Sequence, residues 1–253
     1  MDPSAVIALF IALVSVIGGN ALEGGQLGAL VQPTAAIIVL GGTLGATCVA
    51  STTAEIKLMI KLMKRVVFPG QPDCVKLIEE IVKVSAVARR EGMLAVEGML
   101  DAIDDDFLKR GLRMLVDGAT ADDVKRVLEP EIDVAEHHGT NAGKVLETAG
   151  GFAPTVGILG AVLGLIHVME NLDDPSKLGS GIAVAFVATI YGVGFANILF
   201  IPLGTRIKKI VAVDAEIRVM VLAGILGIAA GSNARQMEEM LAAFSGHPHK
   251  AAA

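Results

Sequence analysis

Two neighbouring apolar runs constrain this chain more than any other feature. They cover Phe152–Met169 and Gly181–Gly204, and a short polar segment, residues 170–177, separates them. A helix needs about 20 residues to cross a hydrocarbon layer about 30 Å thick. Both runs are long enough, so the sequence predicts a helical hairpin that crosses a membrane twice.

The composition agrees with a membrane location. Hydrophobic residues make up 53% of the 253 residues, charged residues only 19%, and the mean hydropathy is +0.63. These values predict an all-α, polytopic membrane protein. With a net charge of −6 and no basic tract interleaved with aromatic residues, nucleic-acid binding has no support. The chain has two cysteines, Cys48 in an apolar run and Cys74 in a polar region. They are too few, and their surroundings too different, to predict a disulfide framework or a zinc site.

Two further apolar runs, Ser4–Leu22 and Thr34–Ala50, bring the predicted transmembrane helices to four. We expect the first run to be an uncleaved span, because Met1–Pro3 offers no positive residue beyond the amino terminus. Four segments follow from this pattern. They are a first hairpin (1–54), a helical cytoplasmic domain (55–150), a second hairpin (151–204), and a cytoplasmic helix and tail (205–253).

The region between the hairpins begins with a basic amphipathic helix. Its expected apolar stripe comprises Ile56, Met59, Ile60, Met63 and Val67. The next helices are expected at Asp73–Arg90, Gly92–Asp101, Asp105–Asp117 and Thr120–Glu136, with Thr120 as an N-cap and residues 137–149 as a connection to the third span. After the fourth span we expect helices at Thr205–Ala230 and Ala234–Phe244, and Val219–Ala230 is too short for a fifth crossing.

The placement of Lys and Arg predicts the orientation. Fourteen of the twenty-one lie between the second and third spans, six follow the fourth span, and Lys177 sits in a hairpin turn. Cytoplasmic segments are enriched in these residues. Both termini and the central segment are therefore expected in the cytoplasm.

Small residues recur on one face of each helix of the second hairpin. The faces comprise Gly157, Ala161 and Gly164 in the first helix, and Ala185, Thr189, Gly192 and Ala196 in the second. Such faces let helices approach closely, but they can equally line a narrow path. Gly41 and Gly45 form a further small-residue pair that is typical of a helix contact. Neither hairpin helix carries an ionisable group near its centre, so any charged relay must come from a partner.

Enzyme chemistry has little support. The dense polar groups are Asp104–Asp106, Asp122–Asp123 and His137–His138, which read as solvated faces of polar helices rather than as catalytic or metal sites. We predict no catalytic residue, no metal and no cofactor. His167 reads as a packing or interfacial histidine, with a proton relay as the alternative.

Transport fits the residues better. Thr189 is the one hydroxyl in the middle of the fourth span, and Thr155 lies nearer the cytoplasmic end of the third; each is either a pathway group or bonded back to its own helix. Pro154 and Pro202 lie near the cytoplasmic ends of their spans. They read either as a paired hinge or, for Pro202, as the end of the membrane segment.

Three ordered motifs resemble the A subunits of flagellar motor stators, the MotA and PomA family. They are GGQLGALVQP at 24–33, ARREGMLAVE at 88–97 and APTVGILGAVLGL at 153–165. The resemblance extends to about Lys209. It implies five A subunits around two copies of a MotB-like, peptidoglycan-anchored B subunit, which supplies an ion-carrying aspartate. It also implies that the complex lies in a bacterial inner membrane, in contact with membrane lipid.

The resemblance also implies roles for particular residues. By motif, Arg89 and Glu97, with Arg90 beside them, match a patch that engages the rotor protein FliG, and Arg90 and Glu97 share a face if their helix is continuous. Pro154 and Pro202 match two functional prolines. Sodium-type relatives carry threonines where this chain has Ala161 and Ala188, and the loss of these oxygen ligands predicts proton coupling.

Two other functions compete with this interpretation. One is a proton-driven energiser of an outer-membrane system of the ExbB/TolQ type, whose members look like three-span proteins. The extra pair of apolar runs at residues 4–22 and 34–50 argues against it. The other is a membrane scaffold that assembles through its small-residue faces without conducting ions.

Overall fold

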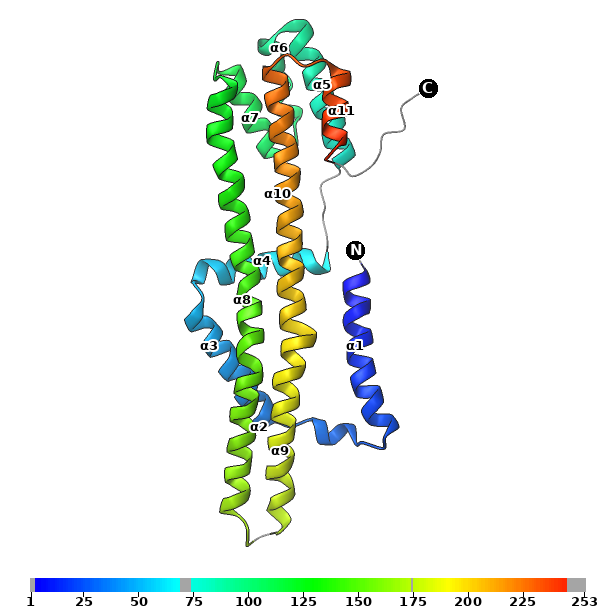
Figure 1. The fold of residues 1–253 in the computed structure, drawn as a ribbon, viewed down its shortest axis with the longest axis vertical. Helices are drawn as coiled ribbons and strands as arrows, with labels where there is room; N and C mark the ends of the chain where they lie inside the picture. The colour runs from blue at the N-terminus through cyan, green and yellow to red at the C-terminus, as the bar shows by residue number, and fades with distance from the viewer. Residues whose placement is uncertain (1–2, 69–73, 174, 245–253) are drawn as a thin grey trace. The chain divides into compact units, whose positions relative to one another are not determined.

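The computed structural model describes residues 3–68, 74–173 and 175–244, and every regular element in these ranges is helical (Figure 1). The helix start expected at Asp73, and Met1 and Asp2 before the expected first span, lie outside these ranges. The chain divides into two compact units. One comprises Met1–Pro69 with His138–Ile210, and the other comprises Gly70–His137 with Val211–Ala253.

The first unit holds the apolar helices. The elements of its first segment, Met1–Pro69, are α1 (Pro3–Leu22), η1 (Leu27–Leu30), α2 (Pro33–Ala36), η2 (Ile37–Gly41), α3 (Gly42–Ala50) and α4 (Thr53–Val67). Parts of α8 (Ala121–Glu170), α9 (Pro175–Gly194), η4 (Phe195–Phe200) and α10 (Ile201–Ala229) complete it. Three continuous helices in the described residues are long and apolar enough to cross a membrane, Leu27–Ala50, Ala121–Glu170 and Leu178–Ala229, and Ile7–Leu22 is a shorter apolar helix. The prediction of an all-helical chain with several apolar spans is confirmed.

α8 and α9 pack through the predicted small-residue faces and run side by side (Figure 1). A Cβ atom at Gly157 would lie 2.9 Å from the Ala188 carbonyl oxygen, and one at Gly164 would lie 2.9 Å from the Ala185 nitrogen. Only glycine fits between backbones at this separation. The glycines therefore set the distance between the two helices.

The connection expected at residues 137–149 is wrong, because α8 continues unbroken from Ala121 to Glu170. Two glycines in or directly after this segment are contact positions. A Cβ at Gly143 would lie 2.9 Å from the Gly204 carbonyl oxygen, and one at Gly150 would lie 2.5 Å from the Ile201 side chain. Both glycines thus serve close packing against α10 rather than helix termination.

Two π-helical turns interrupt the apolar helices. η2 lies between α2 and α3, and η4 lies between α9 and α10. Pro202 follows η4 closely, has no N–H, and cannot donate to the Ile198 carbonyl four residues earlier. A π-turn at this point widens the hydrogen-bonding pattern where the regular bond is missing.

The expected apolar stripe of α4 and the Gly41–Gly45 pair are not buried within the described chain. In α4 the buried side chains are Leu62 and Val66, whereas Ile60 of the expected stripe is 55% exposed. Gly41 and Gly45 contact nothing in the described chain, and the neighbouring Gly42 packs against Val156 instead. Both helices therefore turn apolar or small residues outward, which is normal for a surface in contact with lipid or another subunit.

The second unit is a small helical domain with its own apolar core. It contains α5 (Cys74–Glu91), α6 (Met93–Glu97), η3 (Leu100–Ala102), α7 (Asp106–Val116), α11 (Ala234–Ala242) and the remaining parts of α8 and α10. The largest side chains that are fully buried in its core include Ile81, Leu108, Leu112, Leu128, Met220, Ile225 and Met237. α5, α7 and α11 begin and end within two residues of the predicted ranges, whereas the helix predicted at Gly92–Asp101 is divided into α6 and η3 and the helix predicted to end at Glu136 continues in α8.

Side-chain caps explain where several of these helices begin. The Asp105 carboxylate accepts the Leu108 N–H at 2.7 Å, and Asn233 caps α11 in the same way. Thr120 accepts the Asp123 N–H at 3.2 Å, as expected of an N-cap, and the Asp123 carboxylate accepts bonds from Thr120 in return. These bonds lower the pKa of the exposed Asp123 carboxyl.

Candidate functional site

The two pathway hydroxyls both bond to their own helix. Thr189 Oγ1 donates to the Ala185 carbonyl at 3.3 Å, and Thr155 Oγ1 donates to the Phe152 carbonyl at 2.8 Å. Thr155 is exposed and Thr189 is half-buried. Each hydroxyl donates its proton to a carbonyl of its own helix. The hydroxyl oxygen can therefore act only as an acceptor, or as a ligand, for a passing ion or water molecule.

The two alanines at the sodium-type threonine positions differ in their surroundings. Ala161 is half-buried, whereas Ala188 is fully buried and lies against Gly160, where a Cβ would come within 2.9 Å of the Ala188 methyl group. Added atoms at position 188 must therefore compete with a close part of the α8–α9 contact.

The two prolines lie on the neighbouring helices α8 and α10 and flank one contact. Gly150, one turn before Pro154, packs against Ile201, which directly precedes Pro202. Pro154 itself lies against α9, where a Cβ at Gly192 would come within 3.2 Å of the Pro154 Cα. Pro202 is exposed. The arrangement places both helix-weakening residues around the same crossing of two long helices.

An ion pair that the sequence pattern did not reveal lies next to this crossing. Lys208 of α10 donates to Glu147 of α8 at 2.8 Å, and Thr205 Oγ1 lies 3.4 Å from the same carboxylate. About one third of each charged side chain is exposed. The two residues are far apart in sequence. Glu147 follows Gly143 by one helical turn and Lys208 follows Gly204 by one helical turn, so the close contact of the two glycines brings the charged side chains together.

Tyr191, the single tyrosine of the chain, joins the fourth span to the turn before the second. Its hydroxyl donates to the Leu30 carbonyl and accepts the Gln32 N–H at 3.4 Å. Its ring packs on Phe195 with centroids 5.7 Å apart. The sequence feature that could have indicated this contact is a lone tyrosine within an apolar run, because a buried hydroxyl requires a hydrogen-bond partner.

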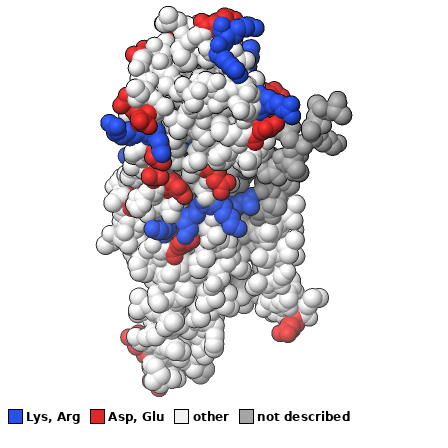
Figure 2. Space-filling model, turned by 45° about the horizontal axis from the view of Figure 1, so that its top comes forward, with Lys and Arg blue, Asp and Glu red and all other residues white. Residues whose placement is uncertain are grey.

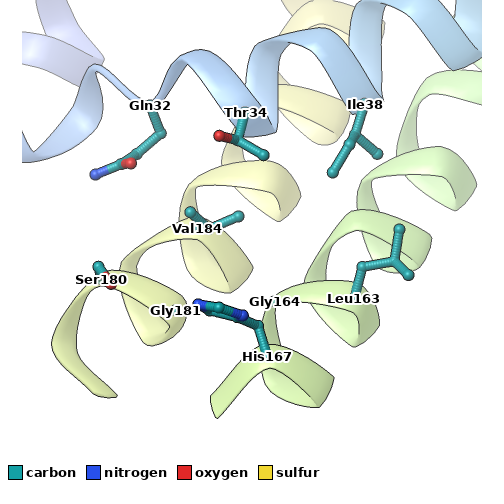
Figure 3. A pocket seen from close by; sticks show the side chains of 9 residues that line it. All are labelled: Gln32, Thr34, Ile38, Leu163, Gly164, His167, Ser180, Gly181 and Val184. Carbon is teal, nitrogen blue, oxygen red and sulfur yellow. The ribbon is translucent and has the colours of Figure 1, made fainter. Parts of the chain in front are cut away.

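His167 lines a cavity of about 400 Å³ between α2, α8 and α9. Figure 3 shows its imidazole beside Gly181 and Val184 of α9, with Gln32 and Thr34 on the opposite wall. The side chain is exposed, which fits the interfacial reading of the expected packing or interfacial histidine. Among the described residues that line this cavity, His167 is the one with a titratable side chain.

The expected rotor-binding residues lie in the second unit and are all exposed. Arg90 donates to the neighbouring Glu91 at 2.6 Å. Gly92 has φ +87°, which ends α5, and Glu97 belongs to the separate helix α6. The shared helical face of Arg90 and Glu97 is therefore wrong, although both side chains remain accessible.

The arrangement lacks the parts of a catalytic or metal centre wherever the structure describes it. No group of three His, Cys, Asp or Glu side chains there is placed to hold a metal ion. Within α8 and α9, the stretches Phe152–Ile166 and Leu178–Gly194 contain no Asp, Glu, Lys, Arg or His. The helix pair offers hydroxyl and carbonyl oxygens, but no carboxylate to carry a proton across.

Family models match both parts of the chain. Residues 99–220 match the MotA/TolQ/ExbB proton channel family, and residues 6–92 match the N-terminal region of motility protein A. The second match includes the first apolar hairpin and supports the motility branch over the ExbB/TolQ type. The family is one of channels and not of enzymes.

Known relatives agree over nearly the full length. Motility protein A of Bacillus subtilis is 34% identical over 95% of this chain and 90% of its own. The structure of C. jejuni MotAB matches with a TM-score of 0.93 at 29% identity, over 100% of this chain and 99% of the other. The flagellar MotAB stator complex from Bacillus subtilis matches with a TM-score of 0.85 at 32% identity, over 94% of each chain. The chain therefore belongs to the MotA family of flagellar stator subunits, within the MotA/TolQ/ExbB proton channels.

Proposed function

We propose that this chain is the ion-conducting, torque-generating A subunit of a flagellar stator that couples proton flow to rotation. The observation that carries the proposal is the α8–α9 hairpin, which combines close packing at glycine with two helix segments free of ionisable groups. A path lined in this way needs an acid from elsewhere to move protons. The solved neighbours are MotAB complexes, which contain a second kind of subunit.

The assembly follows from the same reasoning. We propose two copies of a MotB-like, peptidoglycan-anchored partner inside five copies of this chain. The outward-facing Gly41 and Gly45 and the exposed apolar residues of α1 provide surface for subunits or lipid. The excess of Lys and Arg outside the two hairpin turns supports cytoplasmic termini in a bacterial inner membrane. In this arrangement residues 1–54 and 151–204 are the membrane hairpins, and residues 55–150 and 205–253 are cytoplasmic.

Three positions form the proposed ion pathway of this subunit, Thr189, Ala161 and Thr155. They lie on the two helices of the neutral hairpin, and both hydroxyls retain lone pairs for water or a hydrated proton. Pro154 and Pro202 form the proposed hinge, supported by the π-turn η4 and the single helix crossing between them. Moving one charge through 100 mV yields about 2.3 kcal/mol, enough to shift a two-state hinge.

The exposed Arg89, Arg90 and Glu97 form the proposed rotor-binding surface. The partner with complementary charge is a rotor protein of the FliG type. Mixed charge at an exposed surface favours fast, reversible encounters over tight binding, which suits a contact that is made and broken at every step.

Proton coupling is favoured over sodium coupling by the residues at two positions. Ala161 and Ala188 supply no side-chain oxygen, and the contact of Ala188 with Gly160 leaves little room for one. A dehydrated sodium ion needs several oxygen ligands, whereas a proton moves along hydroxyls and water.

The test is motor rotation in cells that express this chain with its B-type partner. With the proton gradient intact, removing sodium should leave rotation unchanged. A protonophore should stop rotation whatever the sodium concentration. Rotation that depends on sodium and persists with the protonophore would contradict proton coupling, and no rotation under any condition would contradict the stator function itself.

A further inference from the structure

A second cavity lies within the first unit of the chain. It has a volume of about 410 Å³ and is lined by α1, α4, η4 and the start of α10. Its lining includes Leu9 and Ala12 of α1, Val66 of α4, Ile198 of η4, and Pro202 and Arg206 of α10. The volume lies in the range of about 300–1,000 Å³ that is usual for small-molecule sites.

The lining of this cavity is apolar apart from two side chains. Asn197 donates its amide to the Val193 carbonyl at 3.0 Å, which accounts for one of its polar groups. Arg206 is the charged residue among the described residues that line the cavity. An apolar cleft with one guanidinium at its wall matches a ligand with a hydrocarbon part and an anionic group.

Helix α4, which lines the cavity with its last residues, carries further positive charge. Val66 and Val67 are the last residues of α4, whose Lys57, Lys61 and Lys64 are exposed. Figure 2 shows, on one face, a band of basic and acidic side chains at the upper end of a nearly uncharged region. Exposed Ile60, at 55%, gives α4 the mixed apolar and basic surface of a helix that lies in a membrane interface.

We infer that this cleft binds an acyl chain of an anionic phospholipid, with the lipid phosphate at Arg206. A neutral apolar helix from another subunit could fill the apolar part, but it would not complement the positive charge of Arg206 and the lysines of α4. A phospholipid of the interface supplies both parts at once, at about 1 kcal/mol for each basic residue near an anionic membrane surface. The inference depends on the membrane location of the chain and not on ion conduction.

The lipid site also borders the proposed hinge. Pro202 lines the cavity, and Ile198 belongs to the π-turn that precedes it. An acyl chain in the cleft would therefore pack directly against the segment where α9 passes into α10.

The experiment is native mass spectrometry of the complex of this chain with its B-type partner, purified in mild detergent. The probes are dioleoylphosphatidylglycerol, which is anionic, and dioleoylphosphatidylcholine, which is zwitterionic. We expect the native complex to retain the anionic lipid at least about fivefold more than the zwitterionic one, which corresponds to about 1 kcal/mol.

Two variants test the two parts of the site. Arg206→Gln should abolish the preference for the anionic lipid, and Ala12→Phe should reduce retention of both lipids by filling the cleft. Arg235→Gln, an exposed residue of α11 paired with Glu239, is the matched control and should behave as the native complex. Size-exclusion chromatography establishes that each variant still assembles.

Three outcomes would overturn the inference. They are equal retention of both lipids by the native complex, unchanged retention in both cleft variants, or cross-linking of a Leu9→Cys variant to a neighbouring subunit with no lipid bound. The last outcome would identify the cavity as a subunit contact. Loss of rotation with normal lipid retention would contradict the proposed function and leave the lipid site standing.

Discussion

The Lys208 ammonium lies 2.8 Å from both carboxylate oxygens of Glu147, and the pair joins α8 to α10. Two glycines directly beside it, Gly143 and Gly204, hold the backbones close. With about two thirds of each charged side chain buried, removal of one partner leaves a poorly solvated charge behind.

We predict that Glu147→Gln or Lys208→Met lowers the stability of the purified complex by about 1–2 kcal/mol and reduces swimming. The exchange of the two residues, Glu147→Lys with Lys208→Glu, should restore part of both losses. Thermal unfolding and soft-agar motility are the measurements, and Arg235→Gln, which breaks an exposed pair, is the control. Single variants with native stability would show that the pair is dispensable.

A side chain at Gly192 should separate the hairpin helices. A Cβ there would lie 2.5 Å from the Ala153 carbonyl oxygen, so Gly192→Ala should cost about 1–3 kcal/mol and abolish rotation. Gly194→Ala, two residues further along the same helix, meets nothing within 4 Å and should be tolerated. Thermal unfolding and tethered-cell rotation distinguish the two variants, and equal behaviour would refute the contact.

Reversing the charge of the proposed rotor-binding surface should weaken the motor without unfolding the chain. Arg90 and Glu91 form an exposed pair, 77% and 48% exposed, which contributes less than about 1 kcal/mol. Arg90→Glu should therefore leave thermal stability unchanged while reducing the number of stators recruited at the motor to less than about half. Lys125→Glu, an exposed reversal on α8, is the control. Normal recruitment of the Arg90 variant would exclude this surface.

The charge of Glu80 should make stability depend on pH. Burial raises the pKa of its carboxyl, Asp104 and Asp105 raise it further, and Lys83 lowers it. A raised folded pKa favours the protonated form in the folded state. Its stabilising contribution is therefore complete below the unfolded pKa of about 4.3 and is lost as the pH rises through the folded value.

Glu80→Gln should accordingly raise the unfolding midpoint by about 1–2 °C at pH 7, with the difference shrinking as the pH falls toward 4. The effect is small because the carboxylate is partly solvated. Thermal unfolding across this pH range is the measurement, with the exposed neighbour change Glu79→Gln as control. A lowered midpoint, or a difference independent of pH, would contradict the assignment.

The helical pattern and the hairpin contact were predictable from the sequence because they depend on local periodicity. Gly157, Gly164 and Gly192 repeat at helical spacing, and the structure places them at the α8–α9 contact. The N-cap at Thr120 was predictable for the same reason, since a cap acts within four residues.

Features that depend on distant partners were not predictable. The glycines of residues 139–151 resemble a break until α10 lies beside them, and the pair of Glu147 with Lys208 joins residues 61 positions apart. The buried face of α4 was also missed. Ile60 and Leu62 are equally apolar, and only the packing decides that Leu62 turns inward.

The π-turn at Phe195–Phe200 amounts to one additional residue in an otherwise regular helix. Each residue of an α-helix advances the direction of the side chains by about 100°. The π-turn takes up this additional residue, whereas the same residues in a regular α-helix would turn Lys208 by about 100° away from Glu147 and Arg206 away from its cleft. The wider turn thus sets the azimuth of the α10 side chains that follow it in the first unit.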